Sequence, residues 1–407
     1  MREMKDSGIA WIGKIPKEWG IVKFKYLHNG LNTGEAIDKE YWESDAGLNA
    51  FYTAGLTPIR TGYSNFPTWK ETGENDLLLA RNGTPYVYLP VSKAYYTDHI
   101  IRAAMSSLVN RRFIRYCLQQ SIASIAVDSV SIPTWSATLW NNQILTWPSV
   151  IEQERIAAFL DAQCAEIDTV SEKTRASIEE YKKLKQAVIT QAVTKGVRGD
   201  RPMKDSGIEW IGTCPLNWTV CRIKNVIFPQ EKEVLPDDEI ITCFRDGEVT
   251  LRKNRREDGF TVSFTEHGYH GVDKGDLVIH GMDAFAGAIG CSDSRGKTTP
   301  VVHTCKTAGN NRFFMYFLRS MAYGNILMDL SNGVRIRSSD FRNFAKLGVF
   351  GAVMPPLKEQ DEIVDYIDEI VIQMDHLIQK KENLLTEIEN YKKSLIYEYV
   401  TGKKEVV

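Results

Sequence analysis

Near the end of this chain, apolar residues recur with the spacing of a helix that packs against another helix. They lie four and three residues apart in turn, and only Lys381 interrupts them. The positions are Ile363, Ile367, Ile370, Met374, Leu377, Leu384, Ile388, Tyr391 and Leu395. A seam sustained over roughly four heptads is typical of a coiled coil. A matching stretch at residues 156–188 has the same spacing, with polar residues in its middle.

Prolines and glycines bound both of these stretches. Pro148 and Pro355 stand before them, and Gly196 and Gly402 follow them, as the starts and ends of helices favour. We therefore expect two helices of about 45 residues, each roughly 65 Å long at about 1.5 Å per residue. Helices of that length seldom pack only on their own globular domain, so we expect each to have a partner helix.

The chain is internally duplicated. Residues 4–13 (MKDSGIAWIG) return at 203–212 as MKDSGIEWIG, and the two helical stretches align with each other without a gap. A repeat of about 200 residues is far too long for a solenoid, so two homologous halves are expected. The expected parts are globular domains at 1–147 and 200–354, and long helices at 148–199 and 355–407.

This duplication predicts the architecture. Two copies within one chain are expected to be related by a pseudo-twofold axis, and equivalent helices that meet across such an axis run antiparallel. Short apolar runs at Leu77–Leu79 and Leu277–Ile279 predict a buried strand in each globular part. The expected fold class is α+β, with two mixed α/β domains joined by two long helices that form an antiparallel coiled coil.

Composition narrows the class of protein. The chain has 407 residues, of which 43% are hydrophobic and 25% charged, as in ordinary soluble globular proteins. No apolar run approaches the roughly 18 residues of a membrane span, and none follows the charges of the first residues, so we expect a cytoplasmic location. The seven cysteines form no CxxC pair, which favours reduced thiols over a disulfide or zinc framework.

The net charge of −2 conceals an uneven distribution, because the excess of acid lies in residues 355–407. Any binding of nucleic acid must therefore come from local basic clusters. Such clusters occur at Arg111 and Arg112, at residues 252–256 (RKNRR), and at Arg335 and Arg337. Taken alone, a cluster of this kind is more often a solvated face than a contact.

In a chain that binds DNA, the residues that follow the two predicted strands would be the natural place for reading bases, since loops carry side chains to base edges. The first strand is followed by residues 81–84 (RNGT) and the second by 280–283 (HGMD). Different loops on a common scaffold are what two different half-sites require. Arg81 and Asn82 have the chemistry to bind guanine and adenine. An Asn-Gly pair is equally a good turn, so both interpretations stay open.

The sequence offers candidates for DNA binding and none for catalysis or metal binding. The DNA-binding candidates are Arg81, Asn82, Thr84, Arg111, Arg112, Arg252, Lys253, Arg255, Arg256, His280, Arg335 and Arg337. Residues 295–298 (RGKT) end like a phosphate-binding loop, but Cys291 stands where that motif requires glycine. No amino-methyltransferase motif or GxGxxG segment is found, and the histidines near residue 270 lack further ligands at metal spacing.

Four segments together resemble the specificity subunit of type I restriction-modification systems. They are the repeated opening motif, DLLLARNG at 76–83, GDLVIHGMDA at 275–284, and PPLKEQDEIVDYIDE at 355–369, whose helix ends in SLIYEYVTGK. The resemblance covers essentially the whole chain. The first half departs from it at residues 148–153, where only Pro148, Glu152 and Gln153 persist.

The resemblance implies that each globular part is a target recognition domain and that the helices are spacers. A subunit of this kind reads a bipartite, asymmetric target in double-stranded DNA and has no catalysis or cofactor of its own. The expected partners are two modification subunits, which methylate adenine with S-adenosylmethionine, and restriction subunits, which translocate and cut DNA with ATP and Mg. The alternative is a structural scaffold with two protein-binding domains and no role with DNA.

Overall fold

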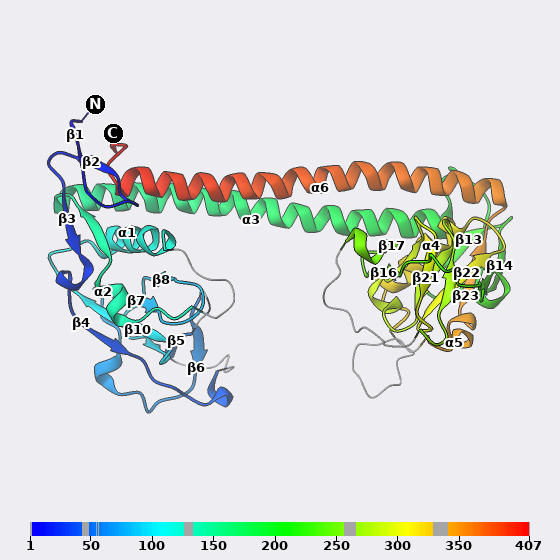
Figure 1. Ribbon diagram of the computed structural model, residues 1–407, viewed down its shortest axis with the longest axis horizontal. Coiled ribbons are helices and arrows are strands. Elements are labelled where there is room, and N and C mark those ends of the chain that lie inside the picture. The colour runs from blue at the N-terminus through cyan, green and yellow to red at the C-terminus, as the bar shows by residue number, and fades with distance from the viewer. Residues whose placement is uncertain are drawn as a thin grey trace. The chain divides into compact units, whose positions relative to one another are not determined.

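The computed structural model describes residues 2–42, 49–53, 55, 57–125, 133–255, 266–328 and 341–406. Its strands and helices form an α+β fold, as the sequence predicts, in two compact units. Unit 1 contains Met1–Thr174 and Asn383–Val407, and unit 2 contains Arg175–Glu382. The long helices α3 (Val150–Lys195) and α6 (Leu357–Val400) each contribute one part to each unit (Figure 1).

Unit 1 is built on an antiparallel four-stranded sheet with the order β4-β10-β7-β8. A three-stranded sheet (β6-β5-β9) and the pairs β1-β2 and β11-β3 complete it. Its strands are β1 (Met4–Asp6), β2 (Lys14–Pro16), β3 (Gly20–Lys23), β4 (His28–Thr33), β5 (Asn49–Tyr52), β6 (Ile59–Thr61), β7 (Asp76–Ala80), β8 (Val87–Tyr88), β9 (Tyr95–Tyr96), β10 (Ile100–Met105) and β11 (Ile144–Trp147). Its helices, besides the long ones, are η1 (Phe24–Tyr26), η2 (Lys39–Tyr41), η3 (Thr68–Lys70), α1 (Arg111–Ala123) and α2 (Ala137–Asn141).

Unit 2 repeats this plan with the antiparallel order β15-β22-β19-β20. The strand pairs β12-β13, β14-β23, β16-β17 and β18-β21 surround that sheet. Its strands are β12 (Met203–Ile208), β13 (Gly212–Pro215), β14 (Thr219–Arg222), β15 (Ile227–Pro229), β16 (Ile241–Cys243), β17 (Val249–Leu251), β18 (His270–Val272), β19 (Leu277–His280), β20 (Ile289–Cys291), β21 (Gly296–Thr298), β22 (Val302–Thr307) and β23 (Gly351–Met354). Its shorter helices are η4 (Ile223–Asn225), η5 (Arg252–Asn254), η6 (Ala284–Ala286), α4 (Asn311–Tyr323) and α5 (Phe344–Gly348).

The two predicted buried strands are confirmed as β7 and β19, inner strands of their sheets. In β7, Leu77 and Leu79 join the main core, whereas Leu78 points to a second cluster on the other face. In β19, Val278 likewise faces away from Leu277 and Ile279. Because side chains alternate across a strand, an apolar residue at every position is what a strand buried on both faces requires.

The same contacts fix a helix in both units. Asn110 caps α1 and Asn310 caps α4, each by accepting backbone N–H groups of the first turn. The amides of Gln153 in α3 and Gln360 in α6 accept from the backbone N–H of these two asparagines, at 3.2 and 2.8 Å. These shared contacts connect the first turn of α1 to α3 and that of α4 to α6, and they explain why the residues recur in both halves.

The repeated opening motif holds a helix end in each unit. Trp19 and Trp218 are 1% exposed and belong to the cores of their units. In unit 1, the Lys403 ammonium group, just beyond α6, donates to the Ile12 carbonyl at 2.7 Å. In unit 2, that of Lys195 at the end of α3 donates to the Ile211 carbonyl, also at 2.7 Å. The opening motif of the first half therefore contacts the end of α6, and the opening motif of the second half contacts the end of α3.

The buried face of the long helices differs from the predicted seam. At alternate seam positions, the less exposed side chain belongs to the next residue along the chain. In α6, Ile378 and Leu395 are buried, but Leu377, Leu384 and Tyr391 are 40%, 43% and 57% exposed. The predicted seam was therefore wrong at these three positions. A corresponding change occurs in α3, where Ser171 and Ile178 are buried instead of the predicted Val170 and Ser177, while Thr174 is buried at a predicted position.

Polar residues account for this difference. The hydroxyl groups of Ser171 and Thr174 donate to the carbonyls of Ile167 and Val170, one helical turn earlier, at 3.0 and 2.8 Å. A hydroxyl group that is satisfied within its own helix can be buried at low cost. Counting apolar residues alone therefore misses Ser171.

Within each unit, the parts of the two long helices run antiparallel. In unit 1, Phe159 packs on Tyr399, and Asp168 accepts from Lys392 at 2.6 Å. In unit 2, Lys185 pairs with Asp375 at 2.5 Å. The two ion pairs are equivalent, because Asp168 and Asp375 occupy the same position of the two halves, and so do Lys185 and Lys392.

Among the described residues, no helix combines the length and apolar character that crossing a membrane requires.

Candidate nucleic-acid interface

In unit 2, the ends of several strands surround an open hollow of about 860 Å³. The hairpin β16-β17, the loop after β19 and the end of β21 meet there. The lining residues are Ile241, Thr242, Cys243, Phe244, Arg245, Asp246, Arg252, Arg255, His280, Asp283, Thr298, Thr299 and Val302. The hollow thus brings together His280 with Arg252 and Arg255, which the sequence identified separately and far apart.

His280 organises the loop that follows β19. Its Nδ1 atom accepts the backbone N–H groups of Met282 and Asp283, at 3.3 and 3.1 Å, so the ring hydrogen resides on Nε2. Burial lowers the pKa of His280, although the nearby Asp283 carboxylate opposes this shift. A neutral histidine is the form that can accept these two bonds. His280 therefore presents a donor to the hollow rather than a positive charge.

Two of the predicted arginines are anchored within the hollow. Arg252 donates through Nε to the Thr242 hydroxyl at 3.3 Å. Arg255 pairs with Asp246 at 2.6 Å and with Glu248 at 3.1 Å. The hydrogen bond that Arg255 donates to the Asp246 carboxylate raises the pKa of Arg255, which stays charged. Acidic partners therefore offset part of the positive charge that the sequence suggested here.

Lys253 points to a neighbouring depression rather than to the hollow. Its ammonium group pairs with Glu239 at 2.5 Å, and both side chains are about half exposed. Arg256, Arg335 and Arg337 lie outside the described residues. Of the basic positions predicted in the second half, the structure therefore brings Arg252 and Arg255 to the hollow and places Lys253 beside it.

In unit 1, the loop after β7 carries the predicted residues in an extended turn. Arg81 is exposed, and its guanidinium group donates to the Asp98 carbonyl at 3.4 Å. The Asn82 amide lies 2.9 Å from Nδ1 of His99. Gly83 has a φ of 75°, as the turn interpretation of this Asn-Gly pair requires. Thr84 is exposed.

Arg111 and Arg112 make internal contacts at the start of α1. Arg111 donates to the Asp76 carbonyl at 3.1 Å, and burial lowers its pKa. Arg112 donates to the Asp161 carboxylate of α3 at 3.0 Å. The same carboxylate accepts from the Tyr116 hydroxyl at 2.8 Å. The described contacts of both arginines hold α1 against β7 and α3, and they do not join the loop of Arg81.

Arg245 and Asp246 also line the hollow, although neither was predicted from the sequence. They stand in the turn between β16 and β17, where Gly247 has a φ of 91° and its N–H donates to the Phe244 carbonyl. An Asp-Gly pair between two short apolar runs is a known hairpin pattern and would have located this turn. It would not have shown that the turn faces His280.

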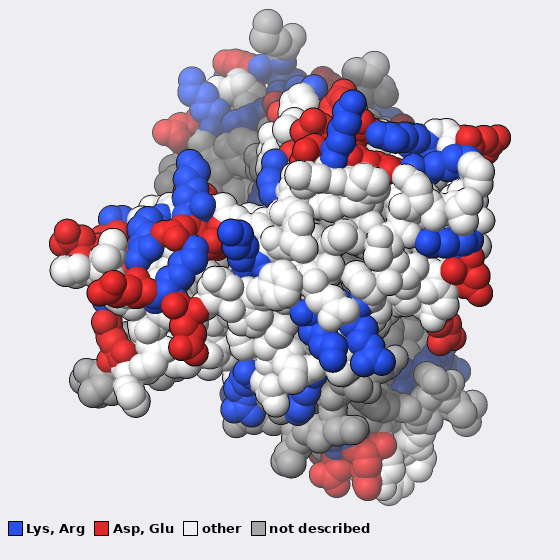
Figure 2. Space-filling view, turned by 90° about the vertical axis from the view of Figure 1, so that its right-hand side faces the viewer, with Lys and Arg blue, Asp and Glu red and all other residues white. Residues whose placement is uncertain are grey.

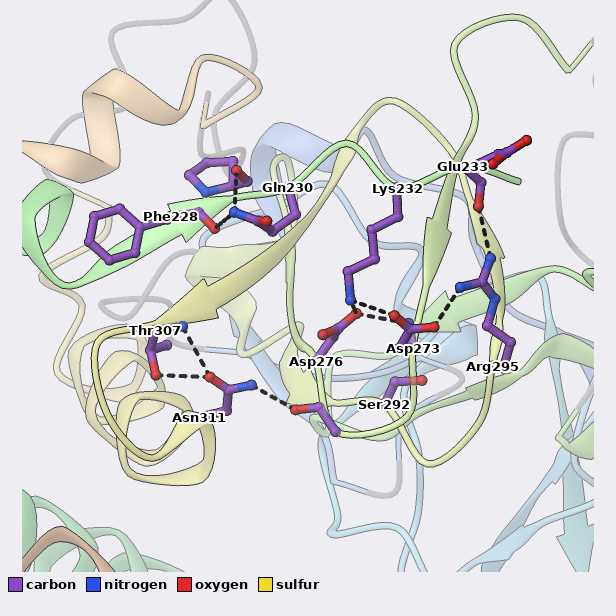
Figure 3. Close-up of polar contacts among 12 residues, drawn as sticks. Phe228, Gln230, Lys232, Glu233, Asp273, Asp276, Ser292, Arg295, Thr307 and Asn311 are labelled. Carbon is purple, nitrogen blue, oxygen red and sulfur yellow. Dashed lines mark hydrogen bonds and ion pairs between the residues drawn. The ribbon is translucent and has the colours of Figure 1, made fainter. Parts of the chain in front are cut away.

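A second polar cluster in unit 2 has its charges paired internally. Lys232 reaches between Asp273 and Asp276, at 2.7 and 2.5 Å, and Arg295 binds the other side of Asp273 (Figure 3). Arg295 also binds Asp238 at 2.9 Å, and this contact lowers the pKa of that carboxyl group. The cluster ties together loops that precede β16, β19 and β21. No group of metal-binding side chains occurs in the part of the chain that the structure describes.

Among the described residues, the Lys and Arg side chains on the face drawn in Figure 2 form no continuous basic surface. They stand in small groups, some beside Asp and Glu and some apart from them, with a broad surface without charged side chains between the groups. This face is therefore not expected to attract the DNA backbone uniformly. Sequence-independent contacts to phosphate would need to come from local sites such as the hollow.

Solved structures are similar to this chain. One, described as the structural basis of complex assembly and conformational transition of the type I R-M system, aligns with a TM-score of 0.65 and 13% identity over 96% of this chain and 99% of the other. The HsdS subunit from Thermoanaerobacter tengcongensis gives a TM-score of 0.46 with 14% identity, covering 96% and 98% of the two chains. The type I restriction-modification S subunit from M. genitalium gives 0.39 with 14% identity, covering 96% and 97%.

The first of these likenesses establishes a common fold over nearly the full length of both chains. The two lower TM-scores support no further argument. No family model matches the sequence, and no curated protein matches it.

Proposed function

We propose that this chain is the DNA-recognition subunit of a type I restriction-modification complex. Each globular part reads one half of a bipartite, asymmetric target in double-stranded DNA. The two long helices, paired as an antiparallel coiled coil about a pseudo-twofold axis, set the spacing between the halves and dock two modification subunits. The chain performs no catalysis, and S-adenosylmethionine, ATP and Mg belong to partner subunits.

One observation carries this proposal: the halves share a scaffold but differ where each inner strand ends. β7 and β19 occupy the same place in sheets of the same order. The first leads to Arg81 and Asn82, and the second leads to His280 in a hollow lined by arginines. A scaffold selected only for protein binding has no need of donors and acceptors that differ in this way. Two half-sites of different sequence do need them.

Exposed apolar positions on the long helices support two docking sites of the same kind. Leu377 and Tyr391 of α6 are 40% and 57% exposed, and the equivalent residues of α3, Val170 and Leu184, are 46% and 49% exposed. The same positions are therefore left uncovered in both halves. Exposed apolar side chains at heptad spacing favour contact with helices of another protein. Duplicated positions favour two copies of that protein.

Selection from randomised duplex DNA with the full chain tests the proposal. We expect a bipartite motif with a fixed gap, and an affinity that falls steeply with salt because phosphate contacts release counterions. Selection of no motif, together with a flat dependence on salt, would contradict the proposal and favour a protein-binding scaffold.

The basic residues after β17 test the contribution of phosphate contacts. Replacing Arg252, Lys253 and Arg255 by alanine should weaken binding to all sequences alike. Each lost phosphate contact should reduce the slope of log K against log salt by about 0.9. Loss of preference at particular base pairs with an unchanged slope would instead assign base reading to these residues.

A further inference from the structure

Arg245 and Asp283 form an ion pair at the rim of the hollow in unit 2. The guanidinium Nη2 donates to the Asp283 carboxylate at 2.9 Å. We propose that this pair reads one G·C base pair of the target, with Arg245 binding guanine and Asp283 accepting from cytosine. The proposal rests on the proposed function and adds a specificity-determining site to it.

Both residues stand on turns that are closed by hydrogen bonds. Arg245 lies in the hairpin turn between β16 and β17, which is closed by the bond from the Phe244 N–H to the Glu248 carbonyl at 2.9 Å. Asp283 lies in the turn after β19, where its own N–H donates to His280 Nδ1 at 3.1 Å. These hydrogen bonds hold the backbone of both turns, and the ion pair joins the two side chains that the turns carry. A base-reading group needs this kind of preorganisation.

The Arg245 side chain is open to solvent and keeps donors that no hydrogen bond to a described residue uses. It is 67% exposed, and Asp283 is 32% exposed. Arginine carries five N–H groups, and the hydrogen bond to Asp283 uses one of them. By contrast, Arg255 is bound by Asp246 and Glu248, and its guanidinium group lies 4.3 Å from the Phe244 ring. Arg245 is therefore better placed than Arg255 to meet a ligand.

The chemistry of the pair matches the major-groove edge of G·C. Guanine presents two acceptors there, O6 and N7, and cytosine presents one donor, the N4 amino group. Arg245 supplies donors and Asp283 supplies an acceptor within hydrogen-bonding distance of each other. A phosphate group would be repelled by the Asp283 carboxylate, so the same arrangement disfavours simple backbone contact.

The first half lacks this pair at the equivalent strand end. There Asn82 contacts His99, and no carboxylate faces Arg81 among its described hydrogen bonds. The pair should therefore affect one half of the motif only. This restriction distinguishes a base-reading site from a general effect on DNA binding.

The experiment compares motifs selected from randomised duplex DNA by the full-length wild type, Arg245→Lys, Arg245→Ala and Arg198→Ala. Arg198 is a matched control, because it forms an exposed ion pair with Glu362 away from the hollow. Arg245→Lys keeps the charge but loses the fork that binds O6 and N7 together. We expect both Arg245 variants to lose roughly 10- to 100-fold of the preference for guanine at one position. Arg198→Ala should select the wild-type motif.

Replacing guanine by 7-deazaguanine at that position supplies a second measurement, because it removes N7 and leaves Watson–Crick pairing intact. The wild type should lose affinity, and Arg245→Ala should be indifferent. An unchanged motif with both Arg245 variants would overturn the proposal while leaving the bipartite target in place. Equal loss of preference in both halves of the motif would overturn it as well. Failure of the wild type to select any motif would instead refute the proposed function.

Discussion

At the scale of single residues, His280 links the stability of unit 2 to its candidate interface. Its Nδ1 atom accepts two backbone N–H groups, and one of these belongs to Asp283, the partner of Arg245. Protonation of His280 would replace this acceptor with a donor. The loop that carries Asp283 is therefore sensitive to the charge of one buried side chain.

Acidification should destabilise unit 2 through this histidine. Burial lowers the pKa of His280 below its ordinary value of 6.5, so the unfolded chain binds the proton more readily than the folded one. The stabilising contribution is complete above that ordinary pKa and is lost as the pH falls below it. His280→Asn keeps an acceptor for the turn but does not titrate. Its urea midpoint should therefore fall less than that of the wild type between about pH 7 and pH 5.5.

His270 also contributes to the pH dependence of the stability of unit 2. Burial lowers its pKa too, so some dependence on pH should persist in His280→Asn. Identical pH profiles for the variant and the wild type would show that protonation of His280 does not weaken the fold.

At the scale of elements, the long helices present two different apolar faces. The less exposed face includes Leu385 and Leu395 of α6, and the exposed face includes the neighbouring Leu384. The sequence alone predicted Leu384 in the helix seam. The two adjacent leucines thus distinguish the observed packing from the predicted one.

Leu385→Ala should destabilise the chain by about 1–2 kcal/mol, because it removes partly buried apolar surface between helices. Leu384→Ala should change the free energy of unfolding by less than about 0.5 kcal/mol, as surface substitutions usually do. Denaturant unfolding of both variants tests this order. Equal losses, or a larger loss from Leu384→Ala, would favour the seam inferred from sequence. If the exposed row docks a partner, Leu384→Ala should instead weaken binding of that partner.

The proposed spacing role of the helices can be tested by inserting a heptad after Ser171 in α3 and another after Ile388 in α6. The ion pair of Asp168 with Lys392 indicates that these sites lie opposite each other in unit 1. A heptad adds about 10 Å at 1.5 Å per residue and keeps the apolar faces aligned. The methylated motif should then gain about three base pairs in its gap, at 3.4 Å per base pair.

Insertion of four residues is the matched control, since it turns the apolar face by about 40° and should impair folding. The added base pairs also rotate one half-site by roughly 100° about the DNA axis, so activity should fall unless the domains turn. Sequencing of methylated sites therefore uses a heptad variant that retains activity. An unchanged gap in such a variant would refute the spacing role.

At the scale of the whole molecule, each unit combines one globular part with portions of both long helices. The two main cores include α3 and α6 residues in each case, such as Leu160 and Leu395 in unit 1 and Ile189 and Ile363 in unit 2. Neither half of the sequence therefore builds a complete unit by itself. Recognition should nevertheless be modular, because the divergent loops lie within residues 1–147 and 200–354.

Replacing residues 1–147 by the corresponding part of a related chain tests this modularity. One half of the selected or methylated motif should change, and the other half and the gap should stay the same. The replacement must preserve the contacts of Trp19 and Ile12 with the long helices, since these hold unit 1 together. A change in both halves at once would contradict separate reading by the two parts.

The sequence by itself determined the duplication, the existence and approximate ends of both long helices, and the buried inner strands. These features depend on local spacing and on repeated residues, which can be read without knowledge of distant contacts. Asn110 and Asn310 also recur at the same position of the two halves, and both prove to be helix caps.

Only the tertiary structure decided which face of each helix is buried and which basic residues share a site. Ser171 can be buried because its hydroxyl group bonds within the helix, a contact that hydrophobic spacing does not reveal. Arg245 meets His280 and Asp283 only because the β16-β17 turn and the end of β19 converge at one hollow. Judged by its residue type, Arg111 was equally suited to bind DNA. In the structure its guanidinium group is partly buried and donates to a backbone carbonyl. A charge in a sequence becomes a binding group only when packing leaves it exposed and incompletely paired.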